Sequence, residues 1–78
     1  MEISRLRWQC RRGMRELDQL LVRYLEQRYE RADEDEKAAF QSLLALSDPQ
    51  LMGYLLNKTA PAPEHAIVVR HILDRTDT

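Results

Sequence analysis

Apolar side chains recur at helical spacing between residues 14 and 30, and this spacing constrains the fold more than any other feature. The members of the series are Met14, Leu17, Leu20, Leu21, Tyr24, Leu25 and Tyr29. An α-helix turns once every ~3.6 residues, so these side chains would line a single face of one helix. The pattern therefore predicts a long amphipathic helix whose apolar face must be buried against other segments of the chain.

Three further segments show the signals of short helices. Residues 4–11 are expected to form the first. Asp33, followed three residues later by Glu36, predicts a helix capped by Asp33. Its apolar face consists of Phe40, Leu43 and Leu44. Asp48 and Pro49 predict another start, with Asp48 as the cap and proline at the first helical position. The apolar stripe of that helix consists of Leu51, Met52, Leu55 and Leu56.

Pro63 predicts the start of a last helix for the same reason. The side chains expected to face inward there are Ile67, Val68, His71 and Ile72. Nowhere does the sequence show the alternation of apolar and polar residues that is typical of a strand. It therefore predicts an all-α fold, a compact bundle of about five short helices, in a single domain that spans residues 1–78.

Small size limits how such a chain is stabilised. A chain of 78 residues buries only roughly 60% of the surface that its unfolded form exposes. Cys10 is the only cysteine, so no internal disulfide forms, and one cysteine with two histidines does not make a zinc site. A lone cysteine without a signal peptide favours a bacterial cytoplasmic protein. No apolar run reaches the ~20 residues that span a membrane, so we expect no membrane insertion.

Catalysis is not expected from these residues. The chain lacks a glycine-rich phosphate loop, a paired-cysteine site and a nucleophile elbow. Nearby arginines would lower the pKa of Cys10, but the more frequent alternative is a small buried residue. His65 and His71 do not share one helical face; we expect His65 to be exposed and His71 to be partly buried. The sequence therefore predicts no catalytic residue, no cofactor site and no metal site, and thus no enzyme.

Charge is distributed unevenly along the chain. Residues 1–15 contain five arginines and one glutamate, a balance of +4, whereas the net charge of the whole chain is −1. This asymmetry favours oriented docking onto an acidic protein surface. A sequence pI of about 6.1 argues against nucleic acid as a partner. Trp8, which lies between Arg7 and Arg11, belongs either to the core or, with these arginines, to an interface.

Arg12, Gly13 and Glu16 lie where the basic segment meets the long helix. Gly13 allows the backbone to turn, and we expect it to cap the helix with Glu16 at the third helical position. Arg12 and Glu16 are four residues apart. They therefore either form an ion pair along the helix or present two opposite charges to a partner. The residues alone leave both alternatives open.

This segment resembles a known family. The run from Arg7 to Asp18 is similar to the signature of the flavinylation assembly factors of succinate dehydrogenase, the SdhE type of bacteria. The family hallmark, Arg-Gly-x-x-Glu, is matched by Arg12, Gly13 and Glu16, and a Trp-x-Cys-Arg segment precedes it. The resemblance extends over residues 5 to about 73 and includes Tyr29, Asp35-Glu36-Lys37, Phe40 and Asp48-Pro49-x-Leu51.

One departure from the family pattern lies in the fourth helix. The family usually carries a tryptophan there, whereas this chain has Gly53-Tyr54-Leu55. Tyr54 keeps an aromatic ring at this place. Gly53 inside a helix is expected to cost about 1 kcal/mol of stability relative to alanine.

The resemblance implies a function that the residues alone do not show. It implies an assembly factor that binds the flavoprotein subunit of succinate dehydrogenase, or of the related fumarate reductase, and promotes covalent attachment of FAD to it. The bond-forming chemistry would reside in the partner. We expect no stably bound flavin, since nothing resembles a dinucleotide site, and we expect a monomer. The residues assigned to partner binding on this basis are Arg5, Arg7, Trp8, Arg11, Arg12, Gly13, Glu16, Asp48 and Tyr54.

An alternative function stays open beside this one. A small helical chain with an arginine-rich start is also typical of a protein-interaction module or regulator unrelated to flavin.

Overall fold

The helical spacing of the apolar residues produces five α-helices in the computed structural model, which describes residues 2–57 and 59–74. They are α1 (Glu2–Gln9), α2 (Arg15–Gln27), α3 (Glu34–Leu44), α4 (Asp48–Leu55) and α5 (Pro63–Leu73), with a short 3-10 turn, η1 (Tyr29–Arg31), after α2. No strand occurs within these ranges. The Cα radius of gyration is 11.3 Å, close to the roughly 11.5 Å of a compact domain of this length. The predicted all-α fold class is confirmed.

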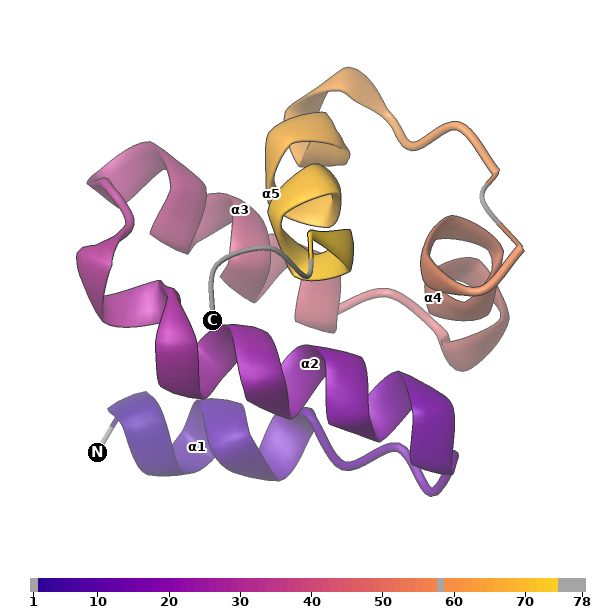
Figure 1. Cartoon of the computed structure of the whole chain (residues 1–78), viewed down its shortest axis with the longest axis horizontal. Coiled ribbons are helices and arrows are strands. Elements are labelled where there is room, and N and C mark those ends of the chain that lie inside the picture. The colour runs from indigo at the N-terminus through magenta and orange to yellow at the C-terminus, as the bar shows by residue number, and fades with distance from the viewer. Residues whose placement is uncertain (1, 58, 75–78) are drawn as a thin grey trace.

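The long helix α2 lies between the other elements (Figure 1). α1 runs alongside it on one side, and α5, which also contacts α3 and α4, packs on the other. The buried residues of α2 are Leu17, Leu20, Leu21, Tyr24 and Leu25. Tyr24 and Tyr29 both contact Phe40 of α3, with ring centroids 4.7 and 5.6 Å apart, respectively. The apolar face that the sequence predicted is therefore confirmed, but the helix is shorter than predicted: α2 ends at Gln27, and Tyr29 is buried from η1.

The starts of α3 and α5 agree with prediction, whereas α1 begins two residues earlier than the predicted range of 4–11 and the caps of α2 and α4 differ. Asp33 caps α3 by accepting a hydrogen bond from the backbone of Glu36, as predicted. Ser47, and not Asp48, caps α4, because its hydroxyl accepts from the backbone of Gln50 in a capping box. Met14, and not Gly13, precedes the first residue of α2, so the predicted cap was wrong by one residue and Glu16 is the second helical residue, not the third.

The facing of α5 also differs from prediction. Val68 and Ile72 are buried and His71 is half-buried, as predicted, but Ile67 is 61% exposed. His65, predicted to be exposed, is buried. Its Nε2 lies 3.2 Å from the hydroxyl of Ser42, while its Nδ1 makes no hydrogen bond with any described residue. The physical reason is a small rotation of the helix: the inward stripe is 65, 68, 69 and 72, which keeps helical spacing and leaves Ile67 on the outer face.

Cys10 belongs to the core. It is fully buried at the end of the first helical segment. Burial raises the pKa of its thiol to about 12, which outweighs the opposing effect of the Arg12 and Arg7 charges. The alternative of a reactive thiolate is therefore wrong, and the buried structural cysteine is confirmed.

No helix in the described part of the chain is long and apolar enough to cross a membrane. Among the same residues, no three histidine, cysteine, aspartate or glutamate side chains gather closely enough to hold a metal ion.

Candidate partner-binding site

The loop between α1 and α2 holds Gly13 in a left-handed conformation. Its φ is +84°, which residues with a side chain rarely adopt. Asp18, one turn into α2, fixes the loop: its carboxylate accepts hydrogen bonds from the backbone N–H of Arg12 at 2.8 Å and of Gly13 at 3.2 Å. Apart from Gly13 and its two chain neighbours, no heavy atom of the described residues lies within 4 Å of the position that a Cβ on Gly13 would occupy. Asp18 thus fixes the loop to the start of α2, and Gly13 itself is exposed to solvent.

Arg12 points back into the protein. Its guanidinium donates hydrogen bonds to the carbonyl of Leu44, in the last turn of α3, and to Oδ1 of Asp48 at 3.4 Å. Only 18% of its side chain is exposed. Of the two alternatives left open by the sequence, the ion pair with Glu16 is not formed among the described residues. Arg12 instead connects the loop to the junction of α3 and α4, where it also meets the negative end of the α3 dipole.

Glu16 is placed in the opposite way. It lies in the first turn of α2, where the helix dipole favours a carboxylate, and its side chain is exposed. Within residues 2–57 and 59–74, it makes no hydrogen bond and no ion pair. The two charges of the motif are therefore separated: the positive charge of Arg12 is used inside the protein, and the negative charge of Glu16 remains at the surface.

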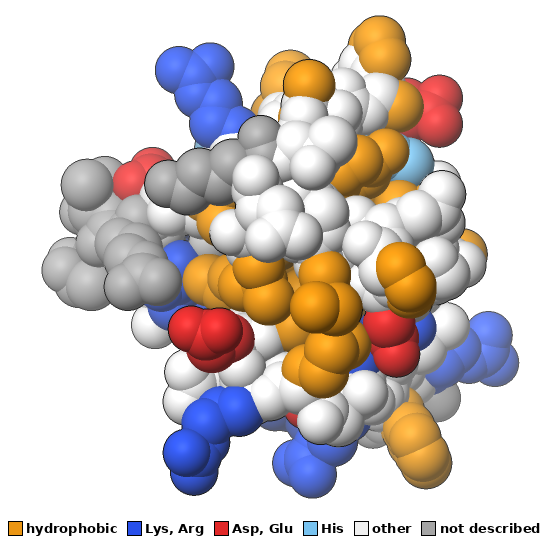
Figure 2. Space-filling view, turned by 90° about the vertical axis from the view of Figure 1, so that its right-hand side faces the viewer, with side chains coloured by type: hydrophobic (Ala, Val, Ile, Leu, Met, Phe, Trp, Pro, Cys, Tyr) orange, Lys and Arg blue, Asp and Glu red, His pale blue; other side chains and the backbone are white. Residues whose placement is uncertain are grey.

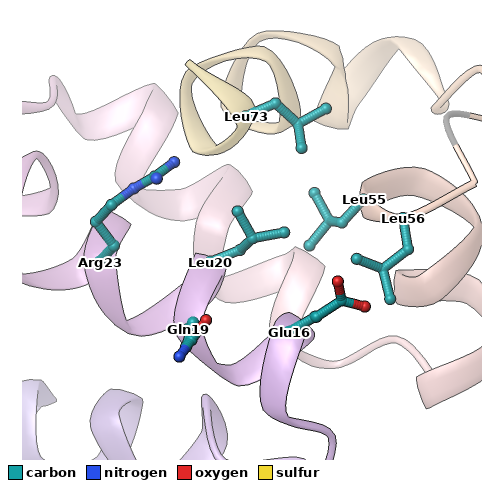
Figure 3. A pocket seen from close by; sticks show the side chains of 7 residues that line it. All are labelled: Glu16, Gln19, Leu20, Arg23, Leu55, Leu56 and Leu73. Carbon is teal, nitrogen blue, oxygen red and sulfur yellow. The ribbon is translucent and has the colours of Figure 1, made fainter. Parts of the chain in front are cut away.

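Beside Glu16 lies a groove of about 810 Å³ between α2, α4 and the end of α5. Leu20, Leu55, Leu56 and Leu73 supply its apolar lining, and Glu16, Gln19 and Arg23 its polar edge. Figure 3 shows the leucines converging from the three helices, with the carboxylate of Glu16 next to Leu56. Figure 2 looks onto the side where α4 and the start of α2 lie and shows apolar side chains gathered in the middle of this face, between acidic ones. We call the groove that these seven residues line the leucine groove.

Sequence reasoning missed the leucine groove, although one signal pointed to it. Leu55 and Leu56 are neighbours in the chain. Successive side chains on a helix point in directions that differ by about 100°, so only one of the two is expected to face the core. Leu55 is buried, whereas Leu56 is only half-buried and lines the groove.

A second surface lies on α1. Trp8 is 76% exposed, so the alternative of a core residue is wrong for it. With Ser4, Arg7 and Arg11 it lines a shallow depression of about 410 Å³. Arg7 forms an ion pair with Glu26 of α2, and Arg5 is exposed on α1. We call Arg5, Arg7, Trp8 and Arg11 the Trp8 surface.

The remaining two candidate residues lie away from the groove. Asp48 pairs with Arg12, and 43% of its side chain is exposed. Tyr54 is half-buried on α4, with its ring centroid 6.2 Å from that of His65. The structure thus brings Arg12, Gly13 and Asp48 together, with Glu16 one turn away, and leaves Tyr54 apart.

The sequence family and the similar proteins that match this chain carry related descriptions. The sequence profile of the Sdh5 family, described as the flavinator of succinate dehydrogenase, matches residues 4–76. An FAD assembly factor SdhE of Legionella pneumophila is 41% identical over 71 residues, which cover 91% of this chain and 90% of that protein. The SdhE of Idiomarina loihiensis is 39% identical over 72 residues, 91% and 80% of the two chains.

The SdhE of Haemophilus ducreyi is 40% identical over 63 residues, 81% of this chain and 76% of the relative. No solved structure matches the chain significantly.

Proposed function

The chain belongs to the Sdh5 family, the flavinators of succinate dehydrogenase, and we propose that its motif residues have different roles in flavinylation. The chain is an FAD assembly factor of the SdhE type, which promotes the flavinylation of succinate dehydrogenase. The resemblance that the Arg-Gly-x-x-Glu motif predicted is therefore confirmed. The alternative of a module unrelated to flavin is not favoured.

The exposed Glu16 is the observation on which the proposed mechanism rests. Its carboxylate has no partner within the described residues, while Arg12 behind it is tied to Leu44 and Asp48. Glu16 binds the flavoprotein subunit, and Arg12 is a positioning residue that holds the loop and the start of α2. Gly13 supplies a loop without a side chain, against which the backbone of the partner approaches closely.

The proposed contribution of the chain is positional. Covalent flavinylation requires the flavin and the target histidine of the flavoprotein subunit to be held close together. Ordering the two reacting groups supplies several kcal/mol of barrier lowering, up to about 7–11 kcal/mol in the best-oriented reactions, without new chemistry. The bond is made between groups of the flavoprotein and its FAD, so this chain contributes no catalytic residue and holds no FAD of its own.

The Trp8 surface extends the proposed contact. Tryptophan and arginine are enriched among the residues that dominate binding energy at interfaces. Trp8 is exposed beside Arg7 and Arg11, which suits an acidic region of the flavoprotein subunit. The proposal includes the related flavoprotein subunit of fumarate reductase as a second partner of the same surface.

A covalent-flavin assay tests the proposed function. The chain is co-expressed with the flavoprotein subunit of succinate dehydrogenase, and separately with that of fumarate reductase, in a strain that lacks its own assembly factor. Flavin fluorescence in a denaturing gel reports covalent attachment. Fluorescence well above that of the empty vector is expected for both subunits. A signal equal to the empty vector with the succinate dehydrogenase subunit would contradict the function.

A further inference from the structure

The leucine groove is an apolar surface that the described residues leave uncovered. We infer that it receives a segment of the flavoprotein partner in which a large apolar side chain lies next to a basic one. The apolar side chain enters between Leu56 and Leu73, and the basic one pairs with Glu16. This inference rests on the proposed function and names the chemistry of the partner at that site.

The shape of the groove supports an apolar guest. Leu20 and Leu55 are almost fully buried and form its floor, whereas Leu56 and Leu73 are half-buried at its sides. A volume of about 810 Å³ lies within the range of roughly 300–1,000 Å³ that is typical of binding pockets. Leaving such a surface in water is unfavourable, and covering it releases free energy in proportion to the apolar area removed from water.

The charges at the edge select a basic neighbour. Arg23 donates hydrogen bonds to the carbonyls of Ile72 at 2.7 Å and Asp74 at 3.4 Å, so its charge is directed to the end of α5. Glu16 makes no such contact with the described residues. The polar edge of the groove therefore favours a positively charged side chain of the partner next to Glu16.

The same charges argue against FAD as the guest. FAD carries a diphosphate, and the carboxylate of Glu16 repels it, while the guanidinium of Arg23 is engaged by backbone carbonyls. Glu16 is also the last residue of the motif, so the groove is continuous with the loop that the proposed function assigns to the flavoprotein subunit. One protein segment that contacts the loop would cover the groove as well.

Lysine substitutions test whether the flavoprotein subunit binds in the leucine groove. Leu56→Lys and Leu73→Lys place a charge in the groove, and Ile67→Lys places the same charge on the exposed outer face of α5 as the matched control. The affinity for the FAD-free flavoprotein subunit of succinate dehydrogenase is measured by titration calorimetry, with thermal unfolding to verify each fold. We expect about tenfold weaker binding or more for the two groove variants and unchanged binding for Ile67→Lys. Equal affinities for all three would overturn the inference.

A second measurement identifies the guest directly and does not depend on a charged variant. The photo-reactive amino acid p-benzoylphenylalanine replaces Leu56, and in a parallel protein Ile67. The expected result is a cross-link from position 56 to a flavoprotein segment with lysine or arginine within about four residues of an apolar side chain, and none from position 67. A cross-link to a second copy of this chain, or to an acidic segment, would overturn the inference. So would saturable binding of FAD to the isolated protein that Leu56→Lys abolishes.

The two proposals fail in different ways. If the wild-type chain neither binds the flavoprotein subunit nor raises its covalent flavin, both the proposed function and the proposed binding in the leucine groove are wrong. If the wild type does both, and the groove variants behave like Ile67→Lys, only the proposed binding in the leucine groove is wrong.

Discussion

The Nη1 atom of Arg12 lies 3.4 Å from Oδ1 of Asp48, across 36 residues of sequence. This pair joins the loop before α2 to the first residue of α4, and a further hydrogen bond from Arg12 to the carbonyl of Leu44 joins the loop to α3. The arginine of the motif therefore acts within the fold, and it fixes the loop that precedes α2 and Glu16.

Arg12→Ala is expected to destabilise the protein. The substitution leaves the Leu44 carbonyl and the Asp48 carboxylate without their donor, and a hydrogen bond to a charged group contributes about 1.5–3 kcal/mol. Because the Asp48 side chain is partly exposed, we expect a loss of about 1–2 kcal/mol in the free energy of unfolding. Chemical denaturation measures this loss, with Arg15→Ala, an exposed arginine at the start of α2, as the control. Equal stability of the two variants would show that the Arg12 contacts do not hold the loop.

Gly13→Ala tests the left-handed backbone of the loop. At a φ of +84°, a residue with a side chain costs about 1–2 kcal/mol, even though no atom stands in the way of the Cβ. Asparagine tolerates this conformation better than alanine. We therefore expect thermal unfolding to rank the wild type first, Gly13→Asn second and Gly13→Ala last. A Gly13→Ala protein as stable as the wild type would contradict this backbone geometry.

Gly53→Ala should act in the opposite direction. Gly53 lies inside α4, and a Cβ there would meet the side chain of Thr59 at 3.5 Å, an ordinary van der Waals distance. Alanine exceeds glycine in helix propensity by about 1 kcal/mol. Thermal unfolding should therefore show Gly53→Ala to be more stable than the wild type by up to that amount. Lower stability would mean that the loop after α4 requires the bare backbone.

The pKa values of two buried groups predict a loss of stability in alkali. Burial raises the pKa of Cys10 from 9.0 to about 12, and burial together with a hydrogen bond to Glu36 raises the pKa of Tyr24 above 10.0. Above pH 9 the unfolded chain releases protons that the folded chain keeps. Stability is thus complete below pH 9 and falls as pH rises towards 12, by up to about 1.4 kcal/mol per pH unit for each group.

Cys10→Ala separates the two contributions. The variant loses some stability at every pH because a small cavity replaces the sulfur, at about 1 kcal/mol. Between pH 9 and 10, however, its free energy of unfolding should stay nearly constant, while that of the wild type declines. The measurement is denaturant unfolding at a series of pH values. Parallel declines of the two proteins over this interval would contradict the assignment to Cys10.

The sequence predicted the helices well because their signals are local. Apolar spacing defined α2, and proline placed the start of α5 correctly. The error of one residue at Ser47 arose because serine and aspartate are both suitable caps. The error at Met14 has another cause: Gly13 lies outside the helix in a left-handed conformation, and Met14 precedes α2 without a side-chain cap. Pro49 placed Asp48 at the expected cap position, but the carboxylate of Asp48 pairs with Arg12.

The site was less predictable because its contacts are distant in sequence. The motif itself was visible, yet the inward direction of Arg12 depends on Leu44 and Asp48, more than 30 residues away. Likewise, the leucine groove forms only when α2, α4 and α5 meet, and no single helix shows it. The rotation that buries His65 and exposes Ile67 is set by the packing of α5 on its neighbours.

In the proposed mechanism, Glu16 acts on the flavoprotein partner, whereas Arg12 acts through the fold. The most direct test is the covalent-flavin assay with Glu16→Gln, which removes the charge but keeps the size of the side chain. We expect its free energy of unfolding to change by no more than about 1 kcal/mol, while covalent flavin in the succinate dehydrogenase subunit falls to the level of the empty vector. Ile67→Gln, a substitution on the exposed face of α5, should leave both quantities unchanged. Wild-type flavin fluorescence with the folded Glu16→Gln protein would contradict the account.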